Sequence, residues 1–178
     1  MSNINIRSAT VADAESILKI YSHYVKNTAI SFEYDVPAVE EFKNRIAHTL
    51  EKYPYLVAEQ NGRIIGYAYG GQFHARAAYS HCAEVSIYVD MDARKCGVGR
   101  ILYEALEEKL KNQGILNLYA CIAYTDTADE YLNNNSAEFH GHLGYKEIGR
   151  FHKCGYKFHR WYDMIWMEKF IGEHKTTS

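Results

Sequence analysis

Apolar residues recur with two different periods along this chain, and the period changes from segment to segment. Spacings of three and four residues, as for Leu102, Leu106 and Leu110, are typical of a helix with one buried face. Strict alternation of apolar and polar residues is typical of a half-buried strand. By these rules we expect helices over 11–27, 37–53, 93–114 and 133–144, and strands over 4–10, 55–60, 63–73, 83–90, 116–124, 145–153 and 160–171.

Local signals agree with these segments. Thr10 is a suitable N-cap for the first helix, and Pro37 suits the first turn of the second. The pair Asn61-Gly62 between two strand patterns predicts a tight hairpin, and Gly114 is a suitable end for the helix before it. An antiparallel start followed by alternating strands and helices predicts an α/β (α+β mixed) fold around one sheet.

Composition limits the size and the partners. The chain has 178 residues, of which 47% are hydrophobic and two are proline, so we expect a single domain over 1–178. A net charge of −2 provides no basic field for nucleic acid or an anionic membrane, and neither is expected as a partner. The first residues lack a signal-peptide pattern, and no apolar run approaches membrane-spanning length.

Cysteine and histidine usage favours a reduced, metal-free protein. The four cysteines are scattered, without a CxxC pair, which indicates reduced thiols and a cytoplasmic location. Nine histidines are present, but neither HxxxH nor HExxH occurs, so no metal site is expected.

Two glycines lie where the helix within 93–114 should begin. Each lowers helix stability by about 1 kcal/mol, so a compensating role is expected. The string is neither a P-loop, which needs GxxxxGK[ST], nor a dinucleotide fingerprint, because Leu102 replaces the third glycine. Arg94, Gly97 and Gly99 instead form R-x-x-G-x-G directly after a strand. Backbone N–H groups at such a helix start can hold a pyrophosphate; a turn without a ligand is the alternative.

The segment "VSIYVDMDARKCGVGRILYEAL" resembles the acetyl-coenzyme A motif of the GNAT superfamily of N-acetyltransferases, and "NNNSAEFHGHLGYKEIG" resembles its second coenzyme-contacting helix. "FHARAAY", "HCAEVSIYV" and "GYKFHRWYDMIWMEK" resemble the phosphinothricin and methionine-sulfoximine branch. The resemblance implies a GNAT-like fold with one mostly antiparallel twisted sheet flanked by helices, acetyl-CoA as co-substrate, and a homodimer. It also implies a set of coenzyme contacts: Ile87, Val89, Arg94, Lys95, Gly97, Val98, Gly99, Arg100, Asn133 and Ser136.

The strand over 83–90 carries the first candidate catalytic residues. By alternation Val85 and its odd-numbered neighbours face the core, while Glu84, Ser86 and Tyr88 face the other way. In the resembling branch the glutamate that matches Glu84 is the general base, and Tyr88 places a phenol on the same side. A carboxylate that is paired with an arginine is the alternative for Glu84.

His140 is the second candidate. It follows Ser136 by four residues and shares its helix face. The resemblance places this histidine near the thioester, where it could orient Glu84 or protonate the leaving sulfur. An exposed helix histidine without a catalytic role is the alternative.

Candidate acceptor residues come from two other segments. Arg76 can pair with a carboxylate through two N–H groups, Tyr79 follows it, and Phe32 resembles a pocket aromatic of the branch. With Glu84 these form the predicted substrate site, although a solvated arginine and a core phenylalanine remain alternatives. Two departures from the branch adjoin this site: His74 replaces a frequent lysine, and the connection over 124–133 is several residues longer.

Three functions are therefore compared. The first is acetylation of the α-amine of a small, glutamate-like acceptor. The second is acetylation of a peptide N-terminus or a polyamine. The third is a non-catalytic acyl-CoA-binding module, which would need neither Glu84 nor His140.

Overall fold

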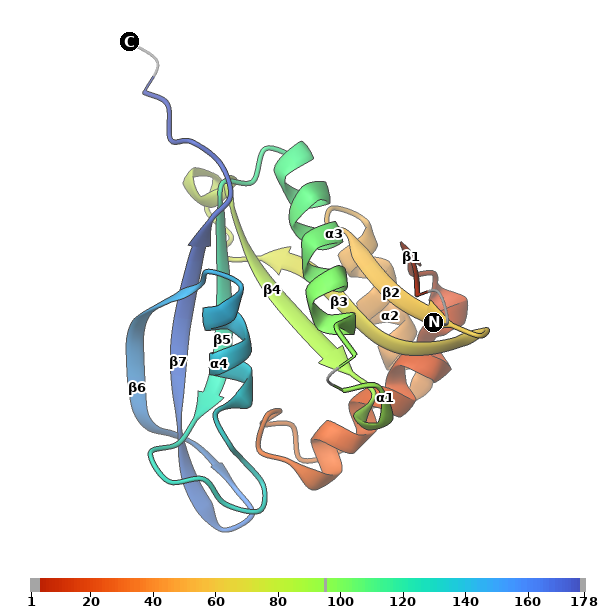
Figure 1. Cartoon of the computed structure of the whole chain (residues 1–178), viewed down its shortest axis with the longest axis vertical. Helices are drawn as coiled ribbons and strands as arrows, with labels where there is room; N and C mark the ends of the chain where they lie inside the picture. The colour runs from red at the N-terminus through yellow and green to blue at the C-terminus, as the bar shows by residue number, and fades with distance from the viewer. Residues whose placement is uncertain (1–3, 95, 177–178) are drawn as a thin grey trace.

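The computed structural model describes residues 4–94 and 96–176. These residues form a seven-stranded sheet in the order β1-β2-β3-β4-β5-β7-β6 (Figure 1). Its strands are β1 (Asn5–Ser8), β2 (Tyr55–Gln60), β3 (Arg63–Gln72), β4 (Cys82–Val89), β5 (Asn117–Tyr124), β6 (Lys146–Lys157) and β7 (Arg160–Phe170). The helices are α1 (Ala14–Asn27), α2 (Val39–Leu50), α3 (Val98–Asn112) and α4 (Asn135–His142), with short 3-10 turns at Val11–Asp13, Ala77–Tyr79 and Met91–Ala93. The predicted mixed fold around one mostly antiparallel sheet is confirmed.

Helices cover both faces of the sheet around β2, β3 and β4. We call the face under α1 and α2 the α1–α2 face, and the face under α3 the α3 face; α4 lies beside β5 (Figure 1). Leu102, Leu106 and Leu110 of α3 are fully buried against the sheet. Burial of one leucine side chain contributes about 1.5–3 kcal/mol, so the helical apolar period holds α3 in place.

The sheet opens between β4 and β5. These two strands are parallel, and they pair only from Cys82–Glu84 to Asn117–Tyr119. Beyond that point β4 continues beside β3 as far as Val89, and β5 continues beside β7 as far as Tyr124. The two strands therefore diverge, and in Figure 1 a wedge widens between their carboxyl ends.

Most predicted caps and turns are confirmed. Thr10 and Asp13 form a capping box at the start of the first helical segment. Asn61 and Gly62 both have positive φ, 52° and 75°, as a two-residue hairpin turn requires. Gly114, with φ of 84°, follows the end of α3.

Two predicted boundaries differ from the structure. α2 begins at Val39 with Ala38 as N-cap, so Pro37 precedes the helix and does not lie in its first turn. β6 continues past 153 to Lys157, because a bulge between Phe151 and Gly155 inserts extra residues. The bulge interrupts the alternation, so the strand pattern ends there although the strand does not.

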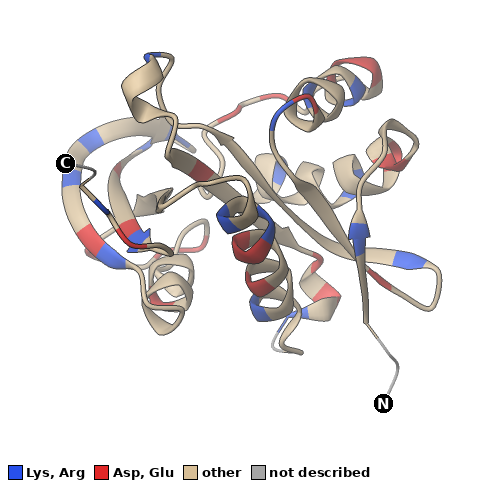
Figure 2. Ribbon diagram, turned by 90° about the horizontal axis from the view of Figure 1, so that it is seen from above, with Lys and Arg blue, Asp and Glu red and all other residues tan. Residues whose placement is uncertain are grey.

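Charged residues of both signs are distributed over the helices and strands, and α3 carries both (Figure 2). No helix within 4–94 and 96–176 is both long and apolar enough to cross a membrane. All four cysteines are free thiols.

Candidate active site

The turn between β4 and α3 exposes backbone donors. Gly97 is the N-cap of α3 with φ of 79°, and nothing lies within 4 Å of the position that its Cβ would take. Helix geometry leaves the next three N–H groups, of Val98, Gly99 and Arg100, without intrahelical acceptors. The exposed Arg94 and Arg100 add positive charge. The turn therefore fits a pyrophosphate group.

The second glycine of this turn has a packing role in addition to the coenzyme role that we expected. A Cβ on Gly99 would lie 3.0 Å from the ring of Phe139 on α4, so Gly99 allows close packing of the two helices. The Val98 side chain is buried in the core, and only its N–H is available to a ligand. The predicted contact Lys95 lies outside the described residues.

The end of β4 presents main-chain groups to the wedge. The N–H of Asp90 donates to the carbonyl of Ile65 on β3 at 2.9 Å. Successive residues of a strand direct their backbone groups to opposite edges, so those of Val89 and Ile87 face away from β3. Their side chains pack against the α3 core. Ile87 thus fits the predicted coenzyme role through its main chain, because an extended amide chain can pair with such an edge. The C=O and N–H of Val89 instead pair with the Tyr24 hydroxyl, at 2.5 and 3.3 Å.

The start of α4 adds polar groups. Asn133 is exposed, and its Oδ1 accepts a hydrogen bond from the N–H of Asn135 at 3.1 Å. Among the described residues no acceptor pairs with its Nδ2, which stays available to a ligand. Ser136 lies in the first turn of α4, and this helix packs through Phe139 on Gly99. The two segments that the sequence predicts to bind the coenzyme are therefore neighbours.

His140 is placed differently from our expectation. Its ring is 3% exposed, and its Nδ1 lies 2.7 Å from the carbonyl oxygen of Ser136. Because a carbonyl only accepts, Nδ1 carries the proton, and Nε2 accepts from the Tyr103 hydroxyl at 2.9 Å. Burial lowers the pKa of His140 to about 4. Both nitrogens are occupied and the ring is neutral at pH 7, so we replace the proposed acid or orienting role with a structural one.

Glu84 lies at the last paired position before β4 and β5 diverge, opposite Gly71 of β3 and Tyr119 of β5. Its side chain points to the α1–α2 face, because the adjacent Val85 packs in the α3 core. Burial raises the pKa of this carboxyl, and the nearby His74 lowers it in part. No arginine or other donor among the described residues pairs with the carboxylate, so it is free to take a proton.

Tyr88 shares the face of Glu84, as predicted, but belongs to a different cluster. Its ring packs edge-on against Tyr21 and Tyr24 at 5.1 Å each and stacks on Tyr67 at 5.3 Å. Burial raises its pKa well above 10. Four strand residues span about 13 Å, so Tyr88 and Glu84 are too far apart to act on one proton. We replace its predicted catalytic role with a packing role.

The loop between β3 and β4 lies over the position of Glu84. Phe73 stacks on Tyr119 at 4.2 Å and meets Trp166 of β7 edge-on at 5.8 Å. This packing carries Arg76 and Tyr79 to the same end of the α1–α2 face. Tyr79 is 37% exposed, Arg76 is exposed, and within the described residues the Arg76 guanidinium has no acidic partner.

Comparison with known proteins identifies the family. The sequence model described as "Acetyltransferase (GNAT) domain" matches residues 6–166. The chain belongs to the GNAT acetyltransferases. The predicted family, fold class and enzyme class are thereby confirmed. The relatives are enzymes, which does not favour the third function, a non-catalytic acyl-CoA-binding module.

Relatives of this acetyltransferase act on different amines. It is 35% identical over 166 residues, 92% of each chain, to an L-methionine sulfoximine/L-methionine sulfone acetyltransferase of Pseudomonas paraeruginosa. A phosphinothricin acetyltransferase of Sinorhizobium meliloti in complex with acetyl-CoA is 32% identical with a TM-score of 0.88, covering 100% of this chain and 93% of that one. A ribosomal-protein-alanine N-acetyltransferase of Brucella melitensis is 32% identical with a TM-score of 0.85, covering 93% and 99%.

The segment that carries Phe32, the predicted pocket aromatic, is held by a contact that the sequence did not reveal. The Phe32 ring lies on Gly155 of β6, where a Cβ would approach it within 2.3–2.8 Å. Lys157 is 2% exposed and donates from Nζ to the carbonyls of Val25, Thr28 and Ser31 at 2.7, 2.9 and 2.6 Å. These bonds fix the segment that carries Phe32. Lys157 lies between the two predicted strands, and nothing in the sequence around it indicated this role.

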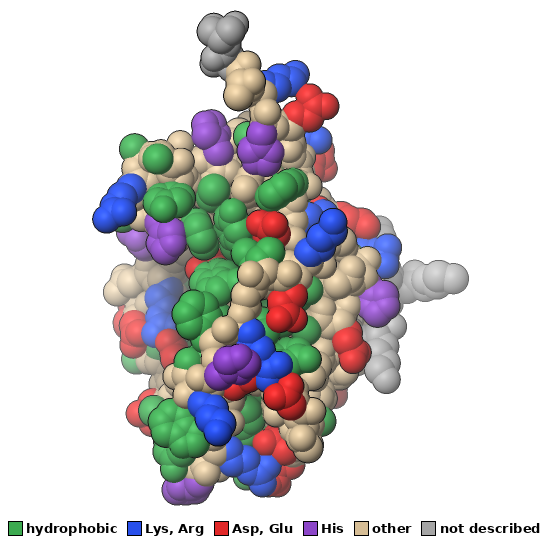
Figure 3. Space-filling view, turned by 90° about the vertical axis from the view of Figure 1, so that its left-hand side faces the viewer, with side chains coloured by type: hydrophobic (Ala, Val, Ile, Leu, Met, Phe, Trp, Pro, Cys, Tyr) green, Lys and Arg blue, Asp and Glu red, His purple; other side chains and the backbone are tan. Residues whose placement is uncertain are grey.

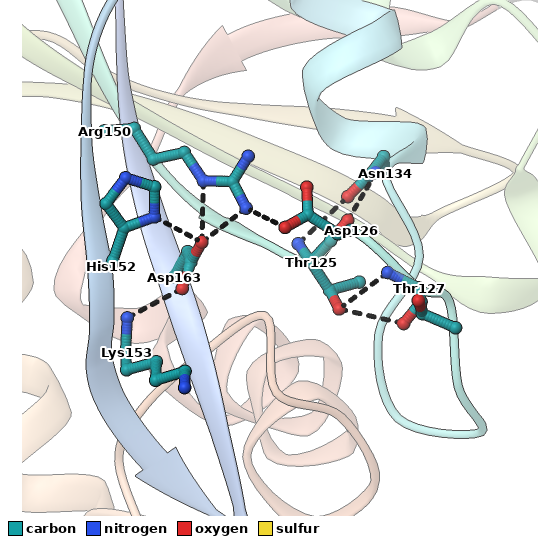
Figure 4. A network of polar contacts seen from close by, with 8 residues as sticks. All are labelled: Thr125, Asp126, Thr127, Asn134, Arg150, His152, Lys153 and Asp163. Carbon is teal, nitrogen blue, oxygen red and sulfur yellow. Dashed lines mark hydrogen bonds and ion pairs between the residues drawn. The ribbon is translucent and has the colours of Figure 1, made fainter.

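The long connection after β5 is built into the same region (Figure 4). Asn134 pairs with the backbone of Thr125 through both side-chain atoms, at 3.3 and 2.8 Å. Arg150 donates to Asp126 and to Asp163, each at 2.6 Å. The connection is therefore tied to β6 and β7 by polar contacts between residues far apart in sequence.

Proposed function

We propose that this protein transfers an acetyl group from acetyl-CoA to the α-amine of a small amino-acid acceptor. One juxtaposition carries the proposal: an unpaired Glu84 carboxyl of raised pKa lies at the apex of the wedge, beneath a loop with an unpaired Arg76. The first group suits deprotonation of an ammonium, and the second suits recognition of a carboxylate.

The coenzyme would be held mainly by backbone. The N–H groups that follow Gly97, the edge of β4 at Ile87, and the Asn133 amide fit its phosphate and amide groups. When bound, acetyl-CoA supplies the acetyl group as a reactive thioester.

Glu84 would act as the base. In its ionised form it accepts one proton from the acceptor ammonium, directly or through one water, and the freed nitrogen pair forms the new bond to the acetyl carbon. The carbon–sulfur bond of the thioester breaks, and the coenzyme leaves as a thiolate that takes up the second proton lost by the nitrogen, by way of water. Cys121 lies nearby on β5, but partial burial and then the Glu84 charge raise its pKa to about 12. Its thiol stays protonated at neutral pH, which favours direct transfer over an acetylated cysteine.

The acceptor would lie between the Arg76 loop and Phe32. Arg76, with Tyr79 beside it, would bind the acceptor carboxylate, and Phe32 would contact its side chain. Phosphinothricin and methionine sulfoximine, which appear in the names of two relatives, are α-amino acids of this kind. The second candidate acceptor is a peptide N-terminus, because the Brucella melitensis relative is named as a ribosomal-protein-alanine N-acetyltransferase. A peptide N-terminus differs from a free amino acid in having an amide in place of the carboxylate next to its amine.

Thiol release from acetyl-CoA tests the proposal against a panel of amino acids, their amides, short peptides and polyamines. We expect turnover with free amino acids and weak turnover with the amides. Arg76→Ala should raise KM for the amino acid about 10- to 100-fold, because a charged hydrogen bond typically contributes about 1.5–3 kcal/mol. Equal turnover of an amino acid and its amide, in both proteins, would contradict the amino-acid assignment.

We also propose a homodimer in the cytoplasm, as the resemblance and the cysteine usage suggest. Exposed apolar side chains gather on β6 and β7, on the face shown in Figure 3; they include Phe151, Trp161 and Phe170, which are 53%, 61% and 58% exposed. An open edge strand with apolar side chains favours self-association. Light scattering should show a dimer that Phe151→Asp dissociates. The control Val11→Asp, at an apolar position that is 45% exposed, should leave the dimer intact.

A further inference from the structure

Two tyrosines of α1 flank one ring of the sheet. Tyr21 and Tyr24 lie one helical turn apart and are 8% and 5% exposed. Each packs edge-on against Tyr88 with ring centroids 5.1 Å apart. Their rings therefore share one environment, but their hydroxyl groups bond to opposite sides of the site.

The Tyr24 hydroxyl holds the end of β4. It donates to the carbonyl of Val89 at 2.5 Å and accepts from the N–H of the same residue at 3.3 Å. It also accepts from Nη2 of Arg94 at 3.3 Å, and that guanidinium lies 5.7 Å from the ring centroid. One donated and two accepted bonds use the full capacity of a phenol. Tyr24 thus joins the open edge of β4 to the arginine of the R-x-x-G-x-G turn.

The Tyr21 hydroxyl holds the other wall. It lies 2.9 Å from Oγ of Ser31, and this oxygen also accepts from the N–H of Glu33 at 3.2 Å. Ser31 is buried, and its carbonyl accepts from the buried Lys157. Between Ser31 and Glu33 lies Phe32, so Tyr21 fixes the turn that presents this ring to Gly155.

We propose that Tyr21 and Tyr24 are positioning residues that divide the site between its two substrates. Tyr24 sets the geometry of the acetyl-CoA side through Val89 and Arg94. Tyr21 sets the geometry of the acceptor side through Ser31 and Phe32. The acceptor half of this inference rests on the proposed function, whereas the coenzyme half rests on the turn alone.

Tyrosine-to-phenylalanine variants test the division, because phenylalanine keeps the ring contact with Tyr88 and removes only the hydroxyl. Tyr24→Phe should raise the calorimetric Kd of acetyl-CoA about three- to tenfold and leave the acceptor KM within twofold. Tyr21→Phe should raise the acceptor KM about three- to tenfold and leave the Kd of acetyl-CoA within twofold. Each variant is the matched control for the other.

A merely structural role predicts a different result. In that case each variant would lower the melting temperature, and it would change the Kd of acetyl-CoA and the acceptor KM by the same factor or leave both unchanged. Either result would overturn the inference. The acetyl-CoA titration needs no acceptor, so a failed amino-acid assignment does not affect the Tyr24 result. The Tyr21 measurement uses whichever amine of the panel the wild-type enzyme acetylates best, so its failure is distinct from failure of the proposed acceptor.

Discussion

The two sides of the β4–β5 wedge are built by different means. On one side, which we call the coenzyme half, β1–β4 are enclosed by α1, α2 and α3, and the groups on this side that we propose for acetyl-CoA are mainly backbone N–H and C=O groups. On the other, the acceptor half, β5–β7 carry exposed aromatic side chains and are joined to loops by polar contacts. Backbone groups suit a constant ligand such as a coenzyme, whereas loop side chains determine which acceptor binds.

Loss of the proposed base should give the largest effect. Glu84→Gln should lower kcat about 10²- to 10⁴-fold, which is the usual contribution of a general base. The Kd of acetyl-CoA should stay unchanged, because Glu84 is not among the groups proposed to bind the coenzyme. Glu168→Gln is a matched control, since Glu168 lies across Tyr119 in the same row of the sheet. Near-native kcat in Glu84→Gln would leave deprotonation to solvent.

The same variant should alter the pH profile. Glu84 acts when ionised, and its raised pKa moves ionisation above the usual carboxyl range. The wild-type kcat/KM should therefore rise with pH through that pKa, and this limb should vanish in Glu84→Gln. An acceptor with a lower amine pKa distinguishes the enzyme group from the substrate group.

The buried His140 should make the protein less stable at acidic pH. Its pKa is about 4 in the folded protein and near 6.5 when unfolded, so the unfolded chain binds more protons between these values. The stabilisation is complete above pH 6.5 and falls as pH drops toward 4, by about 3 kcal/mol in total. Urea unfolding of His140→Gln should show a correspondingly flatter profile over this window.

A neighbouring histidine provides the control. His142 makes the same contact, from Nδ1 to the carbonyl of Glu138 at 2.7 Å, but is exposed. His142→Gln should therefore keep the wild-type pH profile of stability. Equal profiles for wild type and His140→Gln would refute burial as the cause.

The smallest expected effect sharpens the role of the backbone. Gly97→Ala and Gly62→Ala place alanine at φ of 79° and 75°, both in open space, and each should cost about 1–2 kcal/mol of stability. Only Gly97→Ala should also raise the calorimetric Kd of acetyl-CoA, by about tenfold. Equal affinities in the two variants would make Gly97 a turn residue only.

Sequence reasoning succeeded where structure is local. Apolar periods, the Asn61-Gly62 turn and the glycine after α3 depend on neighbouring residues, so the elements of the coenzyme half were predicted closely. The alternation of β4 also placed Glu84 on the correct face.

It failed where contacts join distant segments. The resemblance implied a proton-transfer role for His140, but neither the resemblance nor helix spacing reveals that the ring is buried with both nitrogens bonded, to Ser136 and Tyr103. The packing of Gly99 on Phe139 was missed, because the two residues lie 40 positions apart. Lys157 carried no sequence signal at all, since its three acceptors are backbone carbonyls in the last turn of α1 and in the loop that follows it.

The short β4–β5 pairing has a consequence for how the molecule opens. Only three residue pairs join the two parts of the sheet, whereas β5 pairs with β7 over eight. Side chains join the two parts more widely, since Leu118 and Ile122 of β5 pack in the same core as α3. Because few backbone hydrogen bonds cross between the parts, we expect amide hydrogen exchange to resolve them as two units, one on each side. Lys157 of one unit binds carbonyls of the other. This lysine therefore couples their opening, and Lys157→Met should let β5–β7 exchange independently of α1.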